Sequence, residues 1–172
     1  MYNEDDEFSI IISELVKNNE VQKMKDYLQH YDTSCFTHCY NVAYYSYLIC
    51  KKYNLDYKSA ARAGMLHDLF LYDWRVKQAN RKRFHGYHHP RIALTNSLNL
   101  FELNIKEQNC ILRHMWPLTI IPPKYKEGFI ISFVDKYCTL MESLHYYRNN
   151  LKLKKLYRYS YVFLSMLVIR IF

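Results

Sequence analysis

The stretch GMLHDLFLYDW, residues 64–74, places a histidine and an aspartate side by side at the end of a segment that otherwise has the pattern of a buried helix. Small residues dominate positions 60–64 and predict close packing of this helix against a neighbour. Burying a polar pair such as His67 and Asp68 costs free energy unless both side chains find partners. The pair therefore raises the question of which other polar groups meet it in the core.

The composition predicts one helical domain. A chain of 172 residues with 3 Gly and 4 Pro is poor in turn-forming residues and typical of helices joined by short loops. We expect an all-α fold, a compact bundle of about six to eight helices forming a single domain over residues 1–172. Hydrophobic periodicity and capping residues (Thr33 or Ser34, Asp56 and Asn104) place these helices at about 7–17, 21–30, 34–53, 56–68, 90–101, 104–115 and 125–148.

Two segments depart from this pattern. Residues 69–88 form a polar, basic loop, and Pro90 is well placed as the first residue of the helix that follows it. Residues 151–172, LKLKKLYRYSYVFLSMLVIRIF, begin basic and end apolar. Their apolar part is too short to cross a bilayer and Arg170 interrupts it, so we expect no transmembrane span. This last helix packs either on the domain or on a second subunit, as in a homodimer, or it docks peripherally on an anionic membrane surface.

Cysteine content and net charge indicate the location of the protein and the charge of its partners. The five cysteines form an odd set after an acidic start, which favours free core thiols and a cytoplasmic location, although Cys35 and Cys39 could touch one metal. Lys and Arg number 24 against 16 Asp and Glu, a formal charge of +8, so the surface should attract anions. The 18 tyrosines are spread along the chain rather than clustered beside basic residues, which argues against a nucleic-acid platform as the main function.

Several further polar residues share faces with apolar ones. His38 falls on the apolar stripe of the helix predicted at 34–53, and Asp135 on that of the helix at 125–148. His114 follows Cys110 and Ile111 on one face. Each alone could be a core residue with an ordinary partner, and His89, before Pro90, could be a surface or capping residue.

Convergence on metal explains these exceptions together. Histidine nitrogens and carboxylate oxygens are preferred ligands of divalent Fe, Mn, Co and Zn, and a cation offsets buried negative charge. The two oxygens of Asp68 are suited to bridging two ions. The expected ligands are His38, His67, Asp68, His89, His114 and Asp135.

The ordered set resembles the HD-domain metal-dependent phosphohydrolases. The likeness covers about residues 33–142, in the segments THCYNVAYYSYLI, ARAGMLHD, HHPRIAL, ILRHMWP and FVDKYCTLMES. It implies that His38, His67, Asp68 and Asp135 hold one ion, and that His89 and His114 add a second one bridged by Asp68. Leu69-Phe70 follows the dipeptide in place of the IGK of the HDIG type, and no GYP element occurs, so cleavage of cyclic-di-GMP is not supported.

The expected reaction is hydrolysis of a phosphoester or phosphoanhydride in a small, nucleotide-like substrate. Two ions about 3.5–4 Å apart, with Fe or Mn favoured, would activate a shared water to hydroxide. Besides Asp68, Lys136 is a candidate catalytic group, and Asp73 is either a proton-transfer group or a solvated capping residue. Candidate phosphate-binding residues are Arg81, Lys82, Arg83, His85, His88, Arg91 and Arg113. His30 and His145 lie outside the motif and are expected to serve packing or the surface.

Two other functions remain open on the sequence. The same ligand set can support oxygen chemistry, as in the HD-type di-iron oxygenases that the chain also resembles. A non-catalytic nucleotide- or nucleic-acid-binding protein with a structural metal would also fit the charge of +8. Oxygen uptake would identify the first, and steeply salt-dependent binding without turnover would identify the second. The substrate, the metal and the oligomeric state are not fixed by the sequence.

Overall fold

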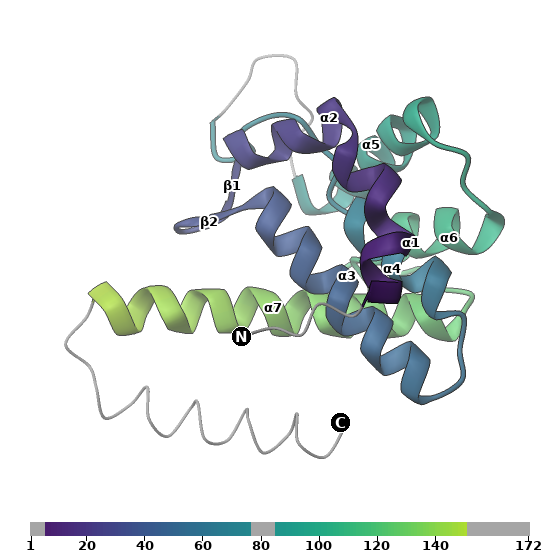
Figure 1. Cartoon of the computed structure of the whole chain (residues 1–172). Coiled ribbons are helices and arrows are strands. Elements are labelled where there is room, and N and C mark those ends of the chain that lie inside the picture. Colours follow the sequence, from purple (N-terminus) through teal and green to yellow (C-terminus); the bar gives the residue numbers. More distant parts are fainter. Residues whose placement is uncertain (1–5, 77–84, 151–172) are drawn as a thin grey trace.

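A computed structural model describes residues 6–76 and 85–150. Within them the protein is mostly helical, with seven α-helices and one short hairpin, which confirms the expected all-α bundle (Figure 1). Residues 77–84, which include Arg81, Lys82 and Arg83, and residues 151–172 lie outside the described part. The elements are α1 (Asp6–Lys17), α2 (Asn19–Gln22), the 3₁₀ helix η1 (Lys23–Asp26), β1 (Leu28–His30), β2 (Thr33–Ser34), α3 (Cys35–Lys52), α4 (Tyr57–Leu66), α5 (His85–Leu100), α6 (Ile105–Arg113) and α7 (Lys126–Asn150).

Polar side chains fix where three helices begin. The Ser34 side chain accepts a hydrogen bond from the backbone N–H of the third residue of α3, and Asp56 does the same for α4. Asn104 and Glu107 form a reciprocal capping box at the start of α6. The predicted caps are thus confirmed, and with them the register of the helices that carry the site.

Helix α4 lies in the centre of the bundle. Its small residues allow close approach to α3, since a Cβ atom added at Gly64 would lie 2.8 Å from the Cα of Ala43. Helix α7, the long helix across the lower part of Figure 1, packs against both α3 and α4. All five cysteines are buried and free, as expected, and the thiol of Cys35 contacts the backbone oxygen of Asp68 at 3.3 Å.

The helix expected at 21–30 is wrong beyond its first turns. The chain there forms α2, η1 and then β1, which pairs antiparallel with β2 through Leu28↔Ser34 and His30↔Thr33. Tyr31 makes the tight reversal possible with a positive φ of 50°, a conformation that costs a non-glycine residue free energy. The reversal pairs β1 with β2, and the side chain of Gln29 on β1 is buried.

The expected start of the next helix at Pro90 is also wrong. In the described residues α5 already includes His85, so Pro90 lies inside the helix. Proline lacks an N–H, and the bond that it would have donated to Gly86 is therefore missing. One residue earlier, the carbonyl of His85 accepts a hydrogen bond from the imidazole Nδ1 of His89 at 3.0 Å.

None of the helices in 6–76 and 85–150 combines the length and the apolar character that a bilayer crossing requires.

Candidate metal centre

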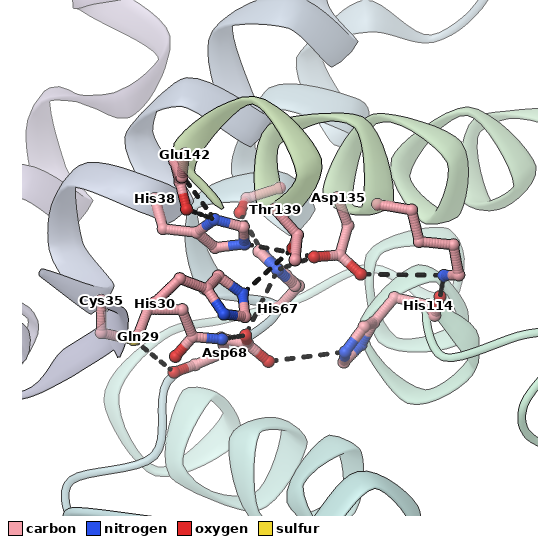
Figure 2. Close-up of polar contacts among 12 residues, drawn as sticks. Gln29, His30, Cys35, His38, His67, Asp68, His114, Asp135, Thr139 and Glu142 are labelled. Atoms are coloured by element: carbon pink, nitrogen blue, oxygen red, sulfur yellow. Dashed lines mark hydrogen bonds and ion pairs between the residues drawn. The ribbon is translucent and has the colours of Figure 1, made fainter. Parts of the chain in front are cut away.

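The structure brings the six predicted ligands into one buried cluster, although five separate segments carry them. None of these side chains belongs to a residue that is more than 8% exposed. We call this set the histidine–aspartate cluster. His38 comes from α3, His67 and Asp68 from the end of α4, His89 from α5, His114 from the end of α6 and Asp135 from α7. Figure 2 labels five of the six: His38, His67, Asp68, His114 and Asp135.

Asp68 lies between two groups of histidines. Its Oδ1 atom lies 3.1 Å from Nε2 of His89 and 3.4 Å from Nε2 of His114. Its Oδ2 atom lies 3.6 Å from Nε2 of His67. The two carboxylate oxygens thus face different sides, as a carboxylate shared by two ions requires.

Asp135 completes the side near α3. Its Oδ1 atom lies 3.1 Å from Nε2 of His38 and 3.7 Å from Nε2 of His67. The other ring nitrogen of His38, Nδ1, lies 3.0 Å from a carboxylate oxygen of Glu142 (Figure 2). A carboxylate in this position holds an imidazole in one orientation and increases its strength as a ligand.

Backbone carbonyls set the tautomers of the other three histidines. Nδ1 of His67 lies 2.7 Å from the oxygen of Gly64, and Nδ1 of His114 lies 2.8 Å from the oxygen of Ile111. His89 makes the equivalent bond inside α5. Because a carbonyl only accepts, each Nδ1 carries the proton, and in the neutral ring each Nε2 offers a lone pair. All three lone pairs belong to atoms that face the interior of the cluster.

These lone pairs leave the cluster short of donors. Nε2 of His89 and Nε2 of His114 lie 2.9 Å apart, so two neutral acceptors would face each other. Among the described residues, Nε2 of His67 and Oδ1 of Asp68 are buried without a hydrogen-bond partner. Unpaired buried acceptors are costly, and a divalent cation satisfies several of them at once. Three overlapping sets of three ligand atoms within 4.8 Å of one another lie in the histidine–aspartate cluster, and a fourth joins His38 to His30 and Glu142, so the donor set fits a metal site.

The carboxylates of the cluster are held as anions. Burial by itself raises the pKa of Asp68, but the contacts with His67 and His89 lower it by more, so that the pKa of Asp68 lies well below its usual value. The same balance applies to Asp135, where burial is outweighed by His38 and His67, and its pKa is also well below the usual value. Both side chains are therefore in the form that binds cations.

A cavity of about 360 Å³ opens onto the cluster. Three cluster residues, Asp68, His89 and Asp135, line it. The rings of Trp74 and His85 also line it and stack on each other, with centroids 5.4 Å apart and an interplanar angle of 15°. Its lining residues are Gln29, His30, Asp68, Trp74, His85, Gly86, His89, Met115, Asp135, Lys136 and Thr139. The volume falls in the range of small-molecule sites.

The predicted substrate residues divide into three groups. His85 and Lys136 line the cavity, and the Lys136 ammonium lies 3.7 Å from Oδ2 of Asp135. His88, Arg91 and Arg113 belong to the described residues but are not among those that line the cavity. Arg81, Lys82 and Arg83 lie in 77–84, outside the described part.

Asp73 is engaged by a neighbour. Its carboxylate accepts hydrogen bonds from the backbone N–H and the guanidinium of Arg75, at 2.9 to 3.1 Å. It is not among the residues that line the cavity. These contacts correspond to the capping role, while proton transfer by Asp73 stays a prediction.

Three residues at the site were missed by sequence reasoning. Gln29 donates a hydrogen bond from Nε2 to Oδ2 of Asp68, and His30 lines the cavity beside the ring of His38. Both lie on β1, in the segment wrongly predicted as helix. Glu142 follows Asp135 by seven residues, a spacing that puts both on one face of α7 and could have revealed it.

The comparisons with known proteins agree with this geometry. The chain matches the HD domain family over residues 35–140, more than half of its length. Searches of curated proteins and of solved structures return no significant match. The matched range contains all six residues of the histidine–aspartate cluster. The chain therefore belongs to the HD-domain family, whose members are typically metal-dependent phosphohydrolases.

Proposed function

We propose that the protein hydrolyses a phosphoester or phosphoanhydride bond of a small, nucleotide-like substrate and uses two divalent ions to do so. The observation that carries this proposal is the orientation of the buried imidazoles. Three of them donate hydrogen bonds from Nδ1 to backbone carbonyls, which leaves three Nε2 lone pairs near the carboxylate of Asp68. Such an arrangement is poorly satisfied by protein groups alone and well satisfied by cations.

We assign the ligands to two ion positions, as the family resemblance implies. His38, His67, Asp68 and Asp135 would hold one ion, and Asp68, His89 and His114 the other. Iron and manganese are the favoured metals, and cobalt and zinc accept the same donors. When bound, such ions supply an activated water and withdraw electrons from the phosphoryl oxygens.

The remaining residues of the cavity bind and orient the substrate. Lys136 brings a positive charge to the lining beside Asp135, where it would attract the phosphoryl group of a substrate. Trp74 and His85, which both line the cavity, add aromatic surface suited to contact with a nucleobase or another planar group. With Glu142 holding His38 from behind, the chain positions its ligands before substrate arrives.

The test is phosphate release by the full chain. Protein purified without oxygen and loaded with Mn²⁺ should release inorganic phosphate from at least one of a panel of nucleotides and simple phosphoesters, and Asp68→Ala should abolish the release. The same activity is expected with and without oxygen. Turnover that requires oxygen and consumes it would replace the proposal with the oxygenase function, and the absence of any turnover would refute it.

A further inference from the structure

His30 occupies a position in the cavity that the family match does not cover. It lies on β1, before residue 35 where the match begins, and the hairpin places it in the cavity lining. Its ring contacts the ring of His38 edge to face, with centroids 5.3 Å apart. Its Nε2 atom lies 3.0 Å from the hydroxyl oxygen of Thr139 on α7 (Figure 2). The ring is therefore held from two sides at the edge of the ligand cluster.

The second nitrogen of this ring is available. Nδ1 of His30 has no hydrogen-bond partner among the described residues, and it is not among their buried unpartnered atoms. Solvent or a ligand can therefore reach it. Since Nε2 is occupied by Thr139 and the residue lines the cavity, Nδ1 is the polar atom that His30 has left for a ligand there.

The cavity also needs such a donor. Within the described lining, Lys136 is the one lysine or arginine, and its ammonium already contacts the oxygen of His114 at 3.2 Å and the oxygen of Ser132 at 3.0 Å. Phosphoryl oxygens are acceptors only. A ring N–H fixed in place can hold one of them without a large loss of side-chain entropy.

We propose that His30 is a substrate-contacting residue that donates a hydrogen bond from Nδ1 to a non-bridging phosphoryl oxygen. In this tautomer the proton of the neutral ring lies on Nδ1, Nε2 accepts a hydrogen bond from the Thr139 hydroxyl, and this contact fixes the ring plane. The hairpin β1–β2 then acts as a recognition element that this chain adds to the HD domain. This inference rests on the proposed function for the identity of the ligand as a phosphoryl group.

Binding of inorganic phosphate to the Mn²⁺-loaded full chain tests the inference without any turnover. His30→Phe keeps a ring against His38 and removes both nitrogens. We expect it to weaken phosphate binding about tenfold in titration calorimetry, as for the loss of one hydrogen bond to a charged group, and to leave the affinity for Mn²⁺ unchanged. His145→Phe, at an exposed histidine on α7, serves as the matched control and should change neither affinity.

Two results would overturn the inference. Unchanged phosphate affinity in His30→Phe would show that the residue does not touch the ligand, and a parallel fall in Mn²⁺ affinity would show that it acts only through the histidine–aspartate cluster. If the variant does not fold, Thr139→Val gives the same test, since it frees the ring and should weaken phosphate binding about threefold; an unchanged affinity there also overturns the inference.

The inference and the proposed function can fail separately. If the wild-type chain binds phosphate in a manner that depends on His30 but releases none from any ester, the proposed function fails and the inference holds. If phosphate release occurs, His30→Phe should raise KM about tenfold with little change in kcat, because the contact exists before and during the reaction.

Discussion

Two clusters of polar side chains, one buried and one partly exposed, lie in the same helical bundle and differ in how their hydrogen bonds and charges are satisfied. The first is the histidine–aspartate cluster. The second, which we call the Lys106 cluster, consists of Asp56, Lys106 and Glu127, where α4, α6 and α7 meet. Nζ of Lys106 lies 3.0 Å from Asp56 and 2.9 Å from Glu127, and the backbone N–H of Asp56 donates to Glu127 at 3.0 Å.

The difference lies in the balance of donors and acceptors. In the Lys106 cluster one ammonium and several backbone N–H groups meet two carboxylates, so protein groups complete every ion pair. In the histidine–aspartate cluster, acceptor atoms face one another and two of them have no partner in the described part of the chain. The Lys106 cluster stabilises the fold by itself, whereas the histidine–aspartate cluster has unpaired acceptors that a cation would complete.

The largest expected effect is the loss of the shared carboxylate. Asp68→Ala should reduce metal binding and phosphate release more than about 100-fold, because even residues that only orient a metal ligand are worth about 10–100-fold. Metal analysis after dialysis and a phosphate-release assay measure both. Asp26→Ala, at an exposed position on η1, is the control. Full metal content in Asp68→Ala would erase the distinction between the two clusters.

Breaking the Lys106 cluster should have the opposite profile. Lys106→Met leaves Glu127 buried without its ammonium partner and should lower the free energy of unfolding by about 2 kcal/mol, allowing for the partial exposure of Lys106 and Asp56. Denaturant unfolding measures this loss, and metal affinity should not change. The exposed Lys58→Met is the control. A fall in metal affinity comparable to that of Asp68→Ala would contradict the structural role.

Glu142 on α7 contacts His38 of the histidine–aspartate cluster, and a neutral variant of Glu142 tests the importance of this contact. Glu142→Gln preserves the shape of the side chain but weakens its hold on the Nδ1 proton of His38, so metal affinity should fall about tenfold. Calorimetric titration with Mn²⁺ measures the change. Glu14→Gln, at an exposed glutamate, should not change the affinity for Mn²⁺. Equal affinities of the wild type, Glu142→Gln and Glu14→Gln would show that Glu142 does not support the metal ligands.

The smallest expected effect is on acid stability. Burial raises the pKa of Glu127, but its contacts with Lys106 and backbone N–H groups lower it more, so its folded pKa is below its ordinary value. A depressed carboxyl pKa contributes stability above the unfolded pKa, and that contribution disappears as pH falls through the folded pKa. Glu127→Gln should therefore flatten the acid side of the stability profile by less than about 1 kcal/mol. An unchanged slope in unfolding titrations between pH about 5 and 3 would contradict this pKa shift.

The helices that carry the site could be predicted because local signals and burial agree in them. Ser34, Asp56 and Asn104 cap their helices as expected, and apolar periodicity fixes which faces are buried. The segment 21–30 was predicted wrongly because Val21 and Met24 are both buried at helical spacing. Its reversal uses Tyr31 rather than a glycine or asparagine, so no turn signal marks the hairpin.

The convergence of the cluster could also be predicted, because His38, His114 and Asp135 are polar exceptions on apolar faces and His67 and Asp68 follow one; His89 is identified through the family resemblance. Contacts made from outside those faces could not. Gln29 and His30 reach the site through the hairpin, and their roles follow from tertiary packing rather than from periodicity. The basic loop shows the opposite limit: its charge predicted phosphate binding, but Arg81 to Arg83 lie outside the described residues and their role stays a prediction.

The central claim is that the histidine–aspartate cluster is completed by metal, and thermal unfolding of the metal-free chain with added Mn²⁺ tests it directly. Binding to the folded state should raise the unfolding free energy by about 2.7 kcal/mol at a free Mn²⁺ concentration 100 times the dissociation constant. The wild type and Lys106→Met should gain equally, and Asp68→Ala should gain almost nothing. A wild-type chain whose unfolding temperature does not respond to Mn²⁺, Fe²⁺, Co²⁺ or Zn²⁺, or an equal gain in Asp68→Ala, would contradict the account.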